Sequence, residues 1–434
     1  MPKKRPQAAE RLPLTAAQQG VWIGQQLAPT CTLYNAAEYL QVNGPLDTTS
    51  FAQALRQTIA ETDALHVRFE ADPGGVIQVL HPPGEWELPV IDVSSEPDPD
   101  RAALDWVGTD LQTVTDLEQG PLFAHALFRL GSDRYRWYHR AHHIALDGYS
   151  FSLIANRVAQ LYTAFVTESP CATGRFGSLR AVVDDEAAYR RSARCEADRE
   201  FWQARFGDAP QAVSLSKRVS VPCGRLIRCS KRLPAHAVDR WRALAEQNGA
   251  TWAEVVLGLT ALYVHRHTGA DEVILGVPVM GRLGSVAART PVMVMNTMPL
   301  RVPVTAQTGT AGVVRAVVAE MRAIRPHQRY RSEQLRRDLQ LVGGSRRLFG
   351  PMVNLMPFDY GLHFAGHPAT ATNLSAGAAF VEDLAIYLHA RADGKPPVLE
   401  LDANPHCYTP AELAMHLDQL TGLLVSAPTP SPVS

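Results

Sequence analysis

The chain has 434 residues and a formal net charge of −1. A single hydrophobic core stops growing near ~250–300 residues, so this length predicts at least two lobes. Acidic and basic residues are interspersed, which provides no broad basic face for a nucleic acid. The most apolar stretch, residues 252–264, is interrupted by Glu254 and is shorter than the ~20 residues of a spanning helix. We expect a monomer that binds neither nucleic acid nor membrane.

The first six residues, MPKKRP, carry positive charge but have no apolar segment behind them, so they do not form a secretory signal. The six cysteines are scattered without a two-residue spacing, as ordinary small residues in a reducing compartment would be. We therefore expect a cytoplasmic protein.

The first third of the chain has a mixed α/β pattern. Helical spacing marks residues 47–62, where Phe51, Leu55 and Ile59 recur every four residues. Extended segments are predicted at residues 34–42, 65–69 and 75–80. Residues 178–206 are charged and helix-forming and follow a Gly/Pro/Ser stretch, so we expect them to connect two lobes, with the boundary near Ser178.

The second half repeats the mixture of elements. We predict a helix at residues 252–267 and strands at 272–279 and 292–302. Near the end, Thr409 and Glu412 form a capping box with Pro410 at the first helical position. Leu413, Leu417, Leu420 and Leu424 then make one apolar stripe. Residues 427–434 are rich in Pro and Ser and predict a flexible tail or linker.

The most informative segment is residues 136–165. Side chains alternate in a strand, so Trp137, His139, Ala141 and His143 should share one face. The sequence HHIALDG covers residues 142–148, and apolar residues with helical spacing follow from Ser150. His143 is therefore expected at the end of a strand, with Gly148 just before a helix.

This arrangement suits acyl transfer. A neutral imidazole with a pKa near ~6.5 can accept a proton from an attacking amine. Backbone N–H groups beside Gly148, at the positive end of a helix, can stabilise an oxyanion. Asp147 can hold the loop through a bond to an arginine. From the residues alone, a buried hydrogen-bonded histidine pair or a fragment of a metal site remains an open alternative.

HHIALDG matches the HHxxxDG signature of the chloramphenicol-acetyltransferase-like superfamily, and further motifs resemble those of nonribosomal peptide synthetase condensation domains. The opening segment LTAAQQGVW (14–22) is similar to their S-x-A-Q-x-R-x-W motif, with Gly20 where Arg is usual. Similar matches are DALHVRF (63–69), VMNTMPLR (294–301) and HQRY (327–330). The resemblance covers almost the whole chain.

Within that family, the sequence is most similar to the condensation domains of the last subunit of enterobactin synthase and related siderophore synthetases. The shared details are Gly20, MGRLGS (280–285), FGPMVN (349–354) and FDY (358–360). Those relatives use aryl donors such as dihydroxybenzoyl, which suggests an aryl acyl donor here.

The resemblance implies a V-shaped pseudo-dimer of two chloramphenicol-acetyltransferase-like α/β lobes, residues 1–178 and 179–426, with a central tunnel. His143 would lie midway as the catalytic base. Donor and acceptor carrier proteins would insert their phosphopantetheine arms, and an adenylation domain would adjoin. No cofactor of the chain's own and no metal are expected.

The resemblance also assigns the remaining site residues. Asp147 would form a structural ion pair with Arg282, or otherwise with Arg301. The motif's catalytic residues would be His143, Gly148 and His142, although a satisfied core histidine is the favoured interpretation of His142. Asn354 and Tyr149 would line the tunnel. A buried amide bonded to backbone is equally open for Asn354, and packing behind the motif is the favoured interpretation of Tyr149.

Other functions remain as alternatives. Heterocyclisation domains carry an aspartate-rich motif that this sequence lacks, and no glutamate can be placed as the catalyst of an epimerisation domain. A free-standing acyltransferase that uses coenzyme A or a soluble amine is the second hypothesis. A non-catalytic recruitment domain is the third, although His143 and Gly148 are both present.

Overall fold

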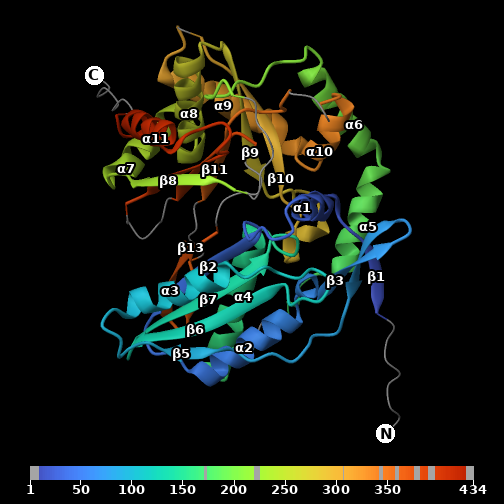
Figure 1. Cartoon of the computed structure of the whole chain (residues 1–434), viewed down its shortest axis with the longest axis vertical. Helices are drawn as coiled ribbons and strands as arrows, with labels where there is room; N and C mark the ends of the chain where they lie inside the picture. The colour runs from blue at the N-terminus through green and yellow to red at the C-terminus, as the bar shows by residue number, and fades with distance from the viewer. Residues whose placement is uncertain are drawn as a thin grey trace. The chain divides into compact units, whose positions relative to one another are not determined.

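The computed structural model describes residues 9–170, 174–218, 225–305, 307–341, 346–356, 361–375, 382–389 and 396–426. The predicted tail at 427–434 and the FDY segment at 358–360 lie outside the described residues. The described chain forms two compact units (Figure 1). Unit 1 takes its residues from 9–191, 284–294 and 361–375, and unit 2 from 192–283, 295–356 and 382–426.

Unit 1 is built on a mixed sheet with strand order β12-β13-β2-β7-β6-β5, beside a small sheet β1-β4-β3. Its strands are β1 (Glu10–Pro13), β2 (Asn35–Asn43), β3 (Val67–Asp72), β4 (Gly75–Leu80), β5 (Val90–Asp92), β6 (Phe123–Gly131), β7 (Arg134–His142), β12 (His363–Phe364) and β13 (His367–Asn373). Its helices are α1 (Ala16–Leu27), α2 (Thr48–Ala60), α3 (Pro99–Leu111), α4 (Gly148–Val166) and α5 (Leu179–Arg190).

The two faces of β7 pack against different helices. Trp137 contacts Phe51 of α2, and His139 contacts Phe151 of α4. Tyr138, on the opposite face, contacts Trp106 of α3 and donates a hydrogen bond to Asp110. The period-two alternation predicted for this strand is confirmed.

Strand β13 joins the sheet of unit 1 from far along the chain. It pairs antiparallel with β2, from Ala369 opposite Val42 to Asn373 opposite Glu38 (Figure 1). Beyond it, Ser375 accepts the N–H of Ala37 through its hydroxyl oxygen. Unit 1 is therefore assembled from segments that are not contiguous in sequence.

Unit 2 is built on a six-stranded sheet with order β10-β9-β11-β14-β15-β8. Its strands are β8 (Ile227–Arg232), β9 (Glu272–Val279), β10 (Asn296–Pro303), β11 (Met352–Met356), β14 (Leu384–His389) and β15 (Val398–Ala403). Its helices are α6 (Ala193–Phe206), α7 (His236–Asn248), α8 (Trp252–Thr268), α9 (Thr310–Ile324), α10 (Ser332–Asp338) and α11 (Pro410–Val425).

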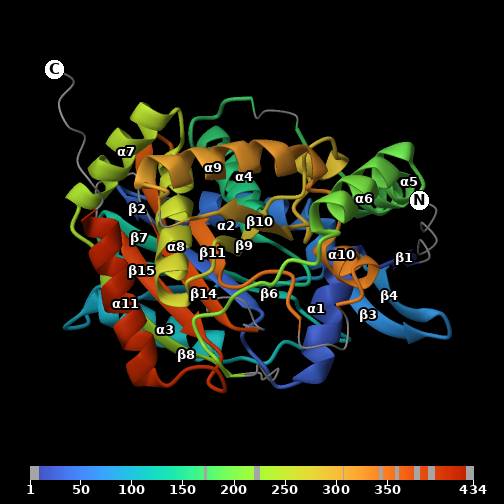
Figure 2. The same ribbon diagram turned by 90° about the horizontal axis from the view of Figure 1, so that it is seen from above.

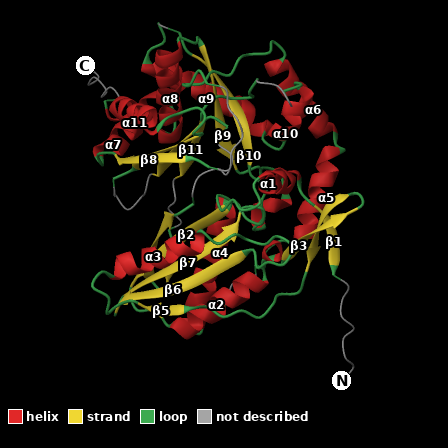
Figure 3. Cartoon of the chain, viewed as in Figure 1, coloured by secondary structure: helices red, strands yellow, loops and turns green. Residues whose placement is uncertain are grey.

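Helices α8, α9 and α11 lie against this sheet, and α7 packs on α8 and α9 (Figure 2 and Figure 3). Their apolar side chains join strand residues such as Val353, Leu399 and Leu401 in one hydrophobic core. Side chains alternate along a strand, so Asn354 and Glu400 point to the other face of the sheet. Asn354, Tyr387, Glu400 and Ser230 are in register across β11, β14, β15 and β8.

Two carboxylates on this second face share one guanidinium. Arg228 donates two hydrogen bonds of 2.6 Å to Asp402 and lies 3.2 Å from a carboxylate oxygen of Glu400. Burial raises the pKa of Glu400 to about 7, Arg228 opposes that rise, and the Asp402 charge adds to it. Glu400 therefore holds its proton to a higher pH in the folded chain than in the unfolded chain.

This difference predicts a pH-dependent effect of Glu400→Gln. As pH rises from the ordinary glutamate pKa toward 7, the unfolded chain loses the proton first, so the free energy of unfolding falls. A glutamine side chain has no such proton to lose, so the variant should be more stable than the parent at pH 8, by at most about 3 kcal/mol, and differ little at pH 5.

Thermal denaturation at both pH values measures the effect. Glu412→Gln is the matched control, since Arg218 and then the Thr409 backbone lower the pKa of exposed Glu412 to about 2 and removal of that charge should destabilise at pH 8. Equal stabilities of parent and Glu400→Gln at pH 8 would contradict the shifted pKa.

Most predicted elements are confirmed, including α2, β2, β4, α8, β9 and α11 with its capping box. The helix-forming stretch 178–206 contains two helices, α5 and α6, and Ser192 caps the second. The two units divide between Arg191 and Ser192, inside that stretch, whereas the sequence placed the lobe boundary near Ser178. The boundary of an independently folding lobe stays a prediction. In the described part of the chain, every helix is too short or too polar to cross a membrane.

Candidate active site

The HHIALDG segment connects β7 to α4 in unit 1. β7 ends at His142 and α4 begins at Gly148. The backbone carbonyl of His142 accepts the N–H groups of Ala145, at 2.9 Å, and Leu146, at 3.3 Å. The loop therefore turns tightly around His142.

His142 is a buried, fully hydrogen-bonded histidine. Its Nδ1 accepts the N–H of Ile144 at 3.2 Å, so its proton must be on Nε2, which donates to Oε1 of Gln25 at 3.1 Å. Burial, and then the neighbouring His143 and Arg140, together lower the pKa of His142 to about 3. His142 is neutral at physiological pH, and neither of its nitrogens is left for chemistry.

His143 is held in the opposite tautomer. Its backbone N–H donates to the carbonyl of Tyr34 at 2.8 Å, and its Nδ1–H donates to the carbonyl of Leu146 at 2.9 Å. A carbonyl oxygen can only accept, so Nδ1 carries a proton, and the neutral form of this ring has its lone pair on Nε2. The side chain is half-buried. This is the form of imidazole that acts as a general base.

Asp147 caps α4. One carboxylate oxygen accepts the N–H of Ser150 at 3.0 Å and its hydroxyl at 2.8 Å, and the other accepts the N–H of Val294 at 3.2 Å. Because of this cap, the helix begins at Gly148 rather than at Ser150 as the sequence suggested. The Asp147 side chain is 1% exposed.

Gly148 is the first residue of α4 and is exposed. A Cβ there would meet no atom within 4 Å, so open space lies beside this part of the backbone. Within the residues that the structure describes, no acceptor is recorded for the Gly148 N–H, as expected in the first turn of a helix. Tyr149 follows in the same turn, where its carbonyl accepts the Ser152 hydroxyl.

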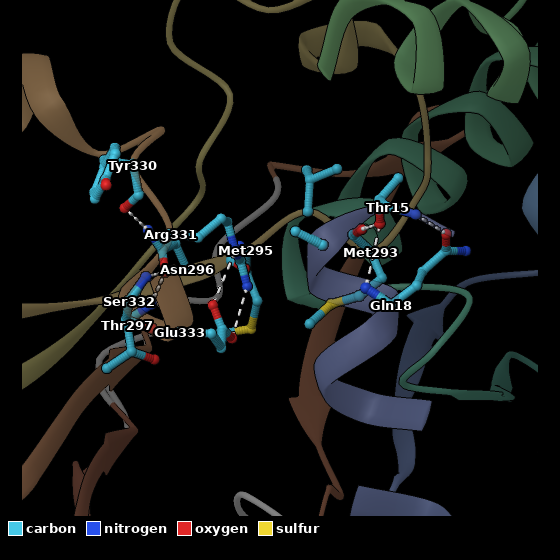
Figure 4. Close-up of polar contacts among 12 residues, drawn as sticks. Thr15, Gln18, Met293, Met295, Asn296, Thr297, Tyr330, Arg331, Ser332 and Glu333 are labelled. Carbon is cyan, nitrogen blue, oxygen red and sulfur yellow. Dashed lines mark hydrogen bonds and ion pairs between the residues drawn. The ribbon is translucent and has the colours of Figure 1, made fainter. Parts of the chain in front are cut away.

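A second segment of unit 1 braces the loop. The N–H of Met293 donates to Ala145 at 2.9 Å, the N–H of Val292 to the Ser150 hydroxyl at 3.0 Å, and Val294 to Asp147. The strand predicted at 292–302 therefore begins only at Asn296, since its first residues bond to the loop instead. The hydroxyl of Thr15, the N-cap of α1, donates to the carbonyl of Met293 (Figure 4).

Asp147→Ala should lower the melting temperature together with activity. The variant loses a helix cap, which costs ~1–2 kcal/mol, and leaves the N–H of Val294 without this acceptor, which costs ~1–3 kcal/mol more. Differential scanning fluorimetry measures the change.

Asp47→Ala is the matched control, because Asp47 caps α2 of the same unit at an exposed site with one hydrogen bond to the Ser50 N–H. Asp47→Ala should lose only the stability that the helix cap provides. An Asp147→Ala protein that melts no lower than the Asp47→Ala protein would show that the bond to Val294 adds nothing.

In unit 2, two predicted motifs meet at Asn296. Its amide nitrogen donates to the carbonyls of Gln328 and Tyr330, and its oxygen accepts the N–H groups of Thr297 and Ser332 (Figure 4). All hydrogen-bonding groups of this buried amide are satisfied. The VMNTMPLR and HQRY segments are thus joined, which the sequence motifs did not reveal.

The same turn positions the segment of Arg282. Gln328 accepts the N–H of Gly281, which has a φ of +66°, and the buried Arg282 donates to the carbonyl of Met280 at 3.1 Å. Arg301 is instead bound to Glu272 and Asp208 of unit 2. The ion pair predicted between Asp147 and Arg282 stays a prediction.

Asn354 lies in β11, half-buried, on the sheet face opposite the hydrophobic core. Its role and that of Tyr149 in a tunnel stay predictions. Among the described residues, no cluster of three or more His, Cys, Asp or Glu side chains could hold a metal ion.

Gln25 is a site residue that the sequence motifs did not indicate. It lies in the last turn of α1, 4% exposed, and bonds to His142. The available signal was its position, because Gln18 and Gln25 are seven residues apart and share a face of α1 with the buried Val21. Two glutamines on the apolar face of a helix indicate specific hydrogen-bond partners.

A strand-end imidazole with its lone pair on Nε2, beside the open N-terminus of a helix, is suited to acyl transfer. Together with the two α/β units, this site is typical of acyltransferases of the chloramphenicol-acetyltransferase-like class. The family model for the condensation domain matches residues 8–427. The chain therefore belongs to the condensation-domain family, as predicted, and condensation domains are amide-bond-forming acyltransferases of nonribosomal peptide synthetases.

Curated relatives are synthetases of this kind. The chain is 45% identical to a dimodular nonribosomal peptide synthase of Bacillus subtilis, covering 95% of this chain and 17% of that protein. It is 47% identical to an isonitrile lipopeptide synthase of Streptomyces coeruleorubidus, covering 96% and 28%. Enterobactin synthase component F of Escherichia coli is 30% identical, covering 96% and 32%. The chain thus spans a third or less of the length of these relatives.

Solved condensation domains have the same fold. The first condensation domain of the calcium-dependent antibiotic synthetase, in complex with a substrate analogue, is 33% identical with a TM-score of 0.86, covering 98% of each chain. A starter condensation domain of rhizomide synthetase, a mutant in complex with C8-CoA and Leu-SNAC, is 34% identical with a TM-score of 0.85, covering 97% of this chain and 96% of that one.

Proposed function

We propose that this chain forms an amide bond between the acyl group of a carrier-bound thioester and the amine of a carrier-bound aminoacyl group. The observation that carries the proposal is the hydrogen bond from His143 Nδ1–H to Leu146, which leaves the Nε2 lone pair as a base. Membership of the condensation-domain family supports the same reaction class.

The residues of unit 1 supply two parts of this chemistry. As the amine attacks the thioester carbonyl, Nε2 of His143 accepts the amine proton and returns it to the departing thiolate. The N–H of Gly148, at the positive end of α4, stabilises the negative oxygen of the tetrahedral intermediate. Asp147 holds the N-terminus of α4 in place. Its proposed ion pair with Arg282 would position Arg282 at the same helix end.

His143→Ala should lower kcat by ~10²–10⁴-fold, because no other described histidine is placed to act as the base. The variant should still fold. Product formation from carrier-bound donor and acceptor is measured by mass spectrometry.

His236→Ala, an exposed residue at the start of α7 in unit 2, is the matched control and should keep full activity. Near-normal turnover by folded His143→Ala would remove the histidine from its proposed role.

Helix α1 offers a surface for a carrier protein. Ile23 is 54% exposed and Leu27 is 71% exposed, and residues four apart lie on one side of a helix. Exposed apolar side chains side by side mark interaction sites. We infer that a carrier protein contacts this pair when its phosphopantetheine arm delivers a substrate.

Leu27→Glu should therefore raise KM at least tenfold for one of the two carrier-bound substrates and leave the rate with the corresponding small-molecule thioester unchanged. Val114→Glu, at a loop residue of unit 1 that is 48% exposed, is the matched control and should change neither. Equal losses with carrier-bound and small-molecule substrates would place Leu27 outside any carrier contact.

Use of a coenzyme A thioester as donor is the second candidate, favoured by the relative solved with C8-CoA. Comparing turnover of the same acyl group on a carrier protein and on coenzyme A distinguishes the two. An aryl donor is proposed from the resemblance of the sequence motifs to those of siderophore synthetases. We further propose a cytoplasmic monomer that adjoins an adenylation domain, with Asn354 and Tyr149 contacting the substrate arms.

A further inference from the structure

Gln25 lies at the start of a one-way chain of hydrogen bonds in unit 1. Its amide nitrogen donates to the carbonyls of Ala28, Pro29 and Cys31, at 3.2, 3.0 and 3.3 Å. These carbonyls can only accept, so the NH₂ group must face them and Oε1 must face His142. The orientation of the Gln25 amide is thereby fixed.

The chain continues through His142 to the backbone of the loop. The N–H of Ile144 can only donate, so His142 Nδ1 must accept it and Nε2–H must point to Gln25. The bonds at both ends therefore require the same tautomer. An apolar residue at position 25 would leave the buried Nε2–H without this acceptor, at a cost that favours rotation or tautomer change of the ring.

The state of His142 reaches His143 through the loop itself. The carbonyl of His142 accepts the N–H groups of Ala145 and Leu146, and the Leu146 carbonyl accepts His143 Nδ1–H. A shift of the His142 ring displaces Ile144 and, with it, the turn that fixes the His143 tautomer.

We propose that Gln25 is a positioning residue for the reaction: by accepting His142 Nε2–H, it fixes the loop that presents the Nε2 lone pair of His143. This inference rests on the proposed function for its effect on rate but not for its effect on His142. The alternative is that Gln25 acts only by holding the loop after α1, through its bonds to the carbonyls of Ala28, Pro29 and Cys31.

Three variants separate these roles. Gln25→Glu keeps an oxygen that accepts His142 Nε2–H but loses the donors to the three carbonyls. Gln25→Lys keeps a donor for the carbonyls but loses the acceptor. Gln25→Met has a similar length and keeps neither.

Positioning predicts that Gln25→Lys and Gln25→Met lower kcat by about 10- to 100-fold with KM changed less than about threefold, because a small displacement of a catalytic group has effects of this size. Gln25→Glu should keep kcat within about fivefold. If Gln25→Lys keeps the kcat of the parent and Gln25→Glu loses it, the bonds to the three carbonyls matter for the rate and the proposal is wrong.

The second readout does not depend on turnover. Nitrogen-15 NMR of the histidine side chains should show His142 protonated on Nε2 and unprotonated on Nδ1 in the parent and in Gln25→Glu at pH 8. It should show a mixture of tautomers in Gln25→Met and Gln25→Lys. An unchanged single tautomer in folded Gln25→Met would overturn the link between Gln25 and His142.

The pH is chosen for the groups around His142. Burial, then His143 of the loop and Arg140 of β7, disfavour a charged His142, and the Tyr34 ring lies against it at a tilt of 43°. Arg140 is itself bound to Asp110 of α3. In Gln25→Glu the new carboxylate favours the charged form of His142. The measurement is therefore made at pH 8, where the His142 ring stays neutral. If the parent lacks condensation activity but shows the expected tautomer pattern, the proposed function fails and the positioning of His142 stands.

Discussion

The lone pair on His143 Nε2 depends on the turn that wraps around the backbone carbonyl of His142. That carbonyl accepts two N–H groups of the loop, and the turn brings the Leu146 carbonyl to His143 Nδ1–H. A neutral histidine in solution exchanges between tautomers, whereas here the acceptor at Nδ1 selects the tautomer with its lone pair on Nε2. The catalytic arrangement is therefore a property of the backbone as much as of the imidazole.

This turn is stabilised by segments that lie far away in the sequence. Met293 and Val294 bond to Ala145 and Asp147, and β13 extends the sheet to which β7 belongs. Contacts of such sequence separation close large loops, which delays their formation during folding. Residues 9–191 alone lack two segments of unit 1, so a fragment ending at Arg191, or at the predicted boundary near Ser178, would lack the bonds that hold the Asp147 end of the loop.

Local patterns were sufficient for much of the fold and for part of the site. Repeats of apolar residues located α2, α8 and α11, and HHIALDG located His143, since these signals lie within one short segment. The start of β10 was predicted too early because its apolar residues resemble a strand, while their N–H groups bond to Ala145 and Ser150 instead. Gln25 was missed for the same reason, because its partner His142 is 117 residues away.

The two histidines of the motif show why identity of residue type does not imply identity of role. The two side chains are adjacent in sequence, yet a backbone N–H meets Nδ1 of His142 and a backbone carbonyl meets Nδ1 of His143. The backbone N–H at His142 occupies the Nδ1 lone pair, so the proton of that ring is on Nε2 and is donated to Gln25. The backbone carbonyl at His143 accepts the Nδ1 proton, so the lone pair of that ring in its neutral form is on Nε2. The polarity of a single backbone group at each Nδ1 thus decides which histidine can act as a base.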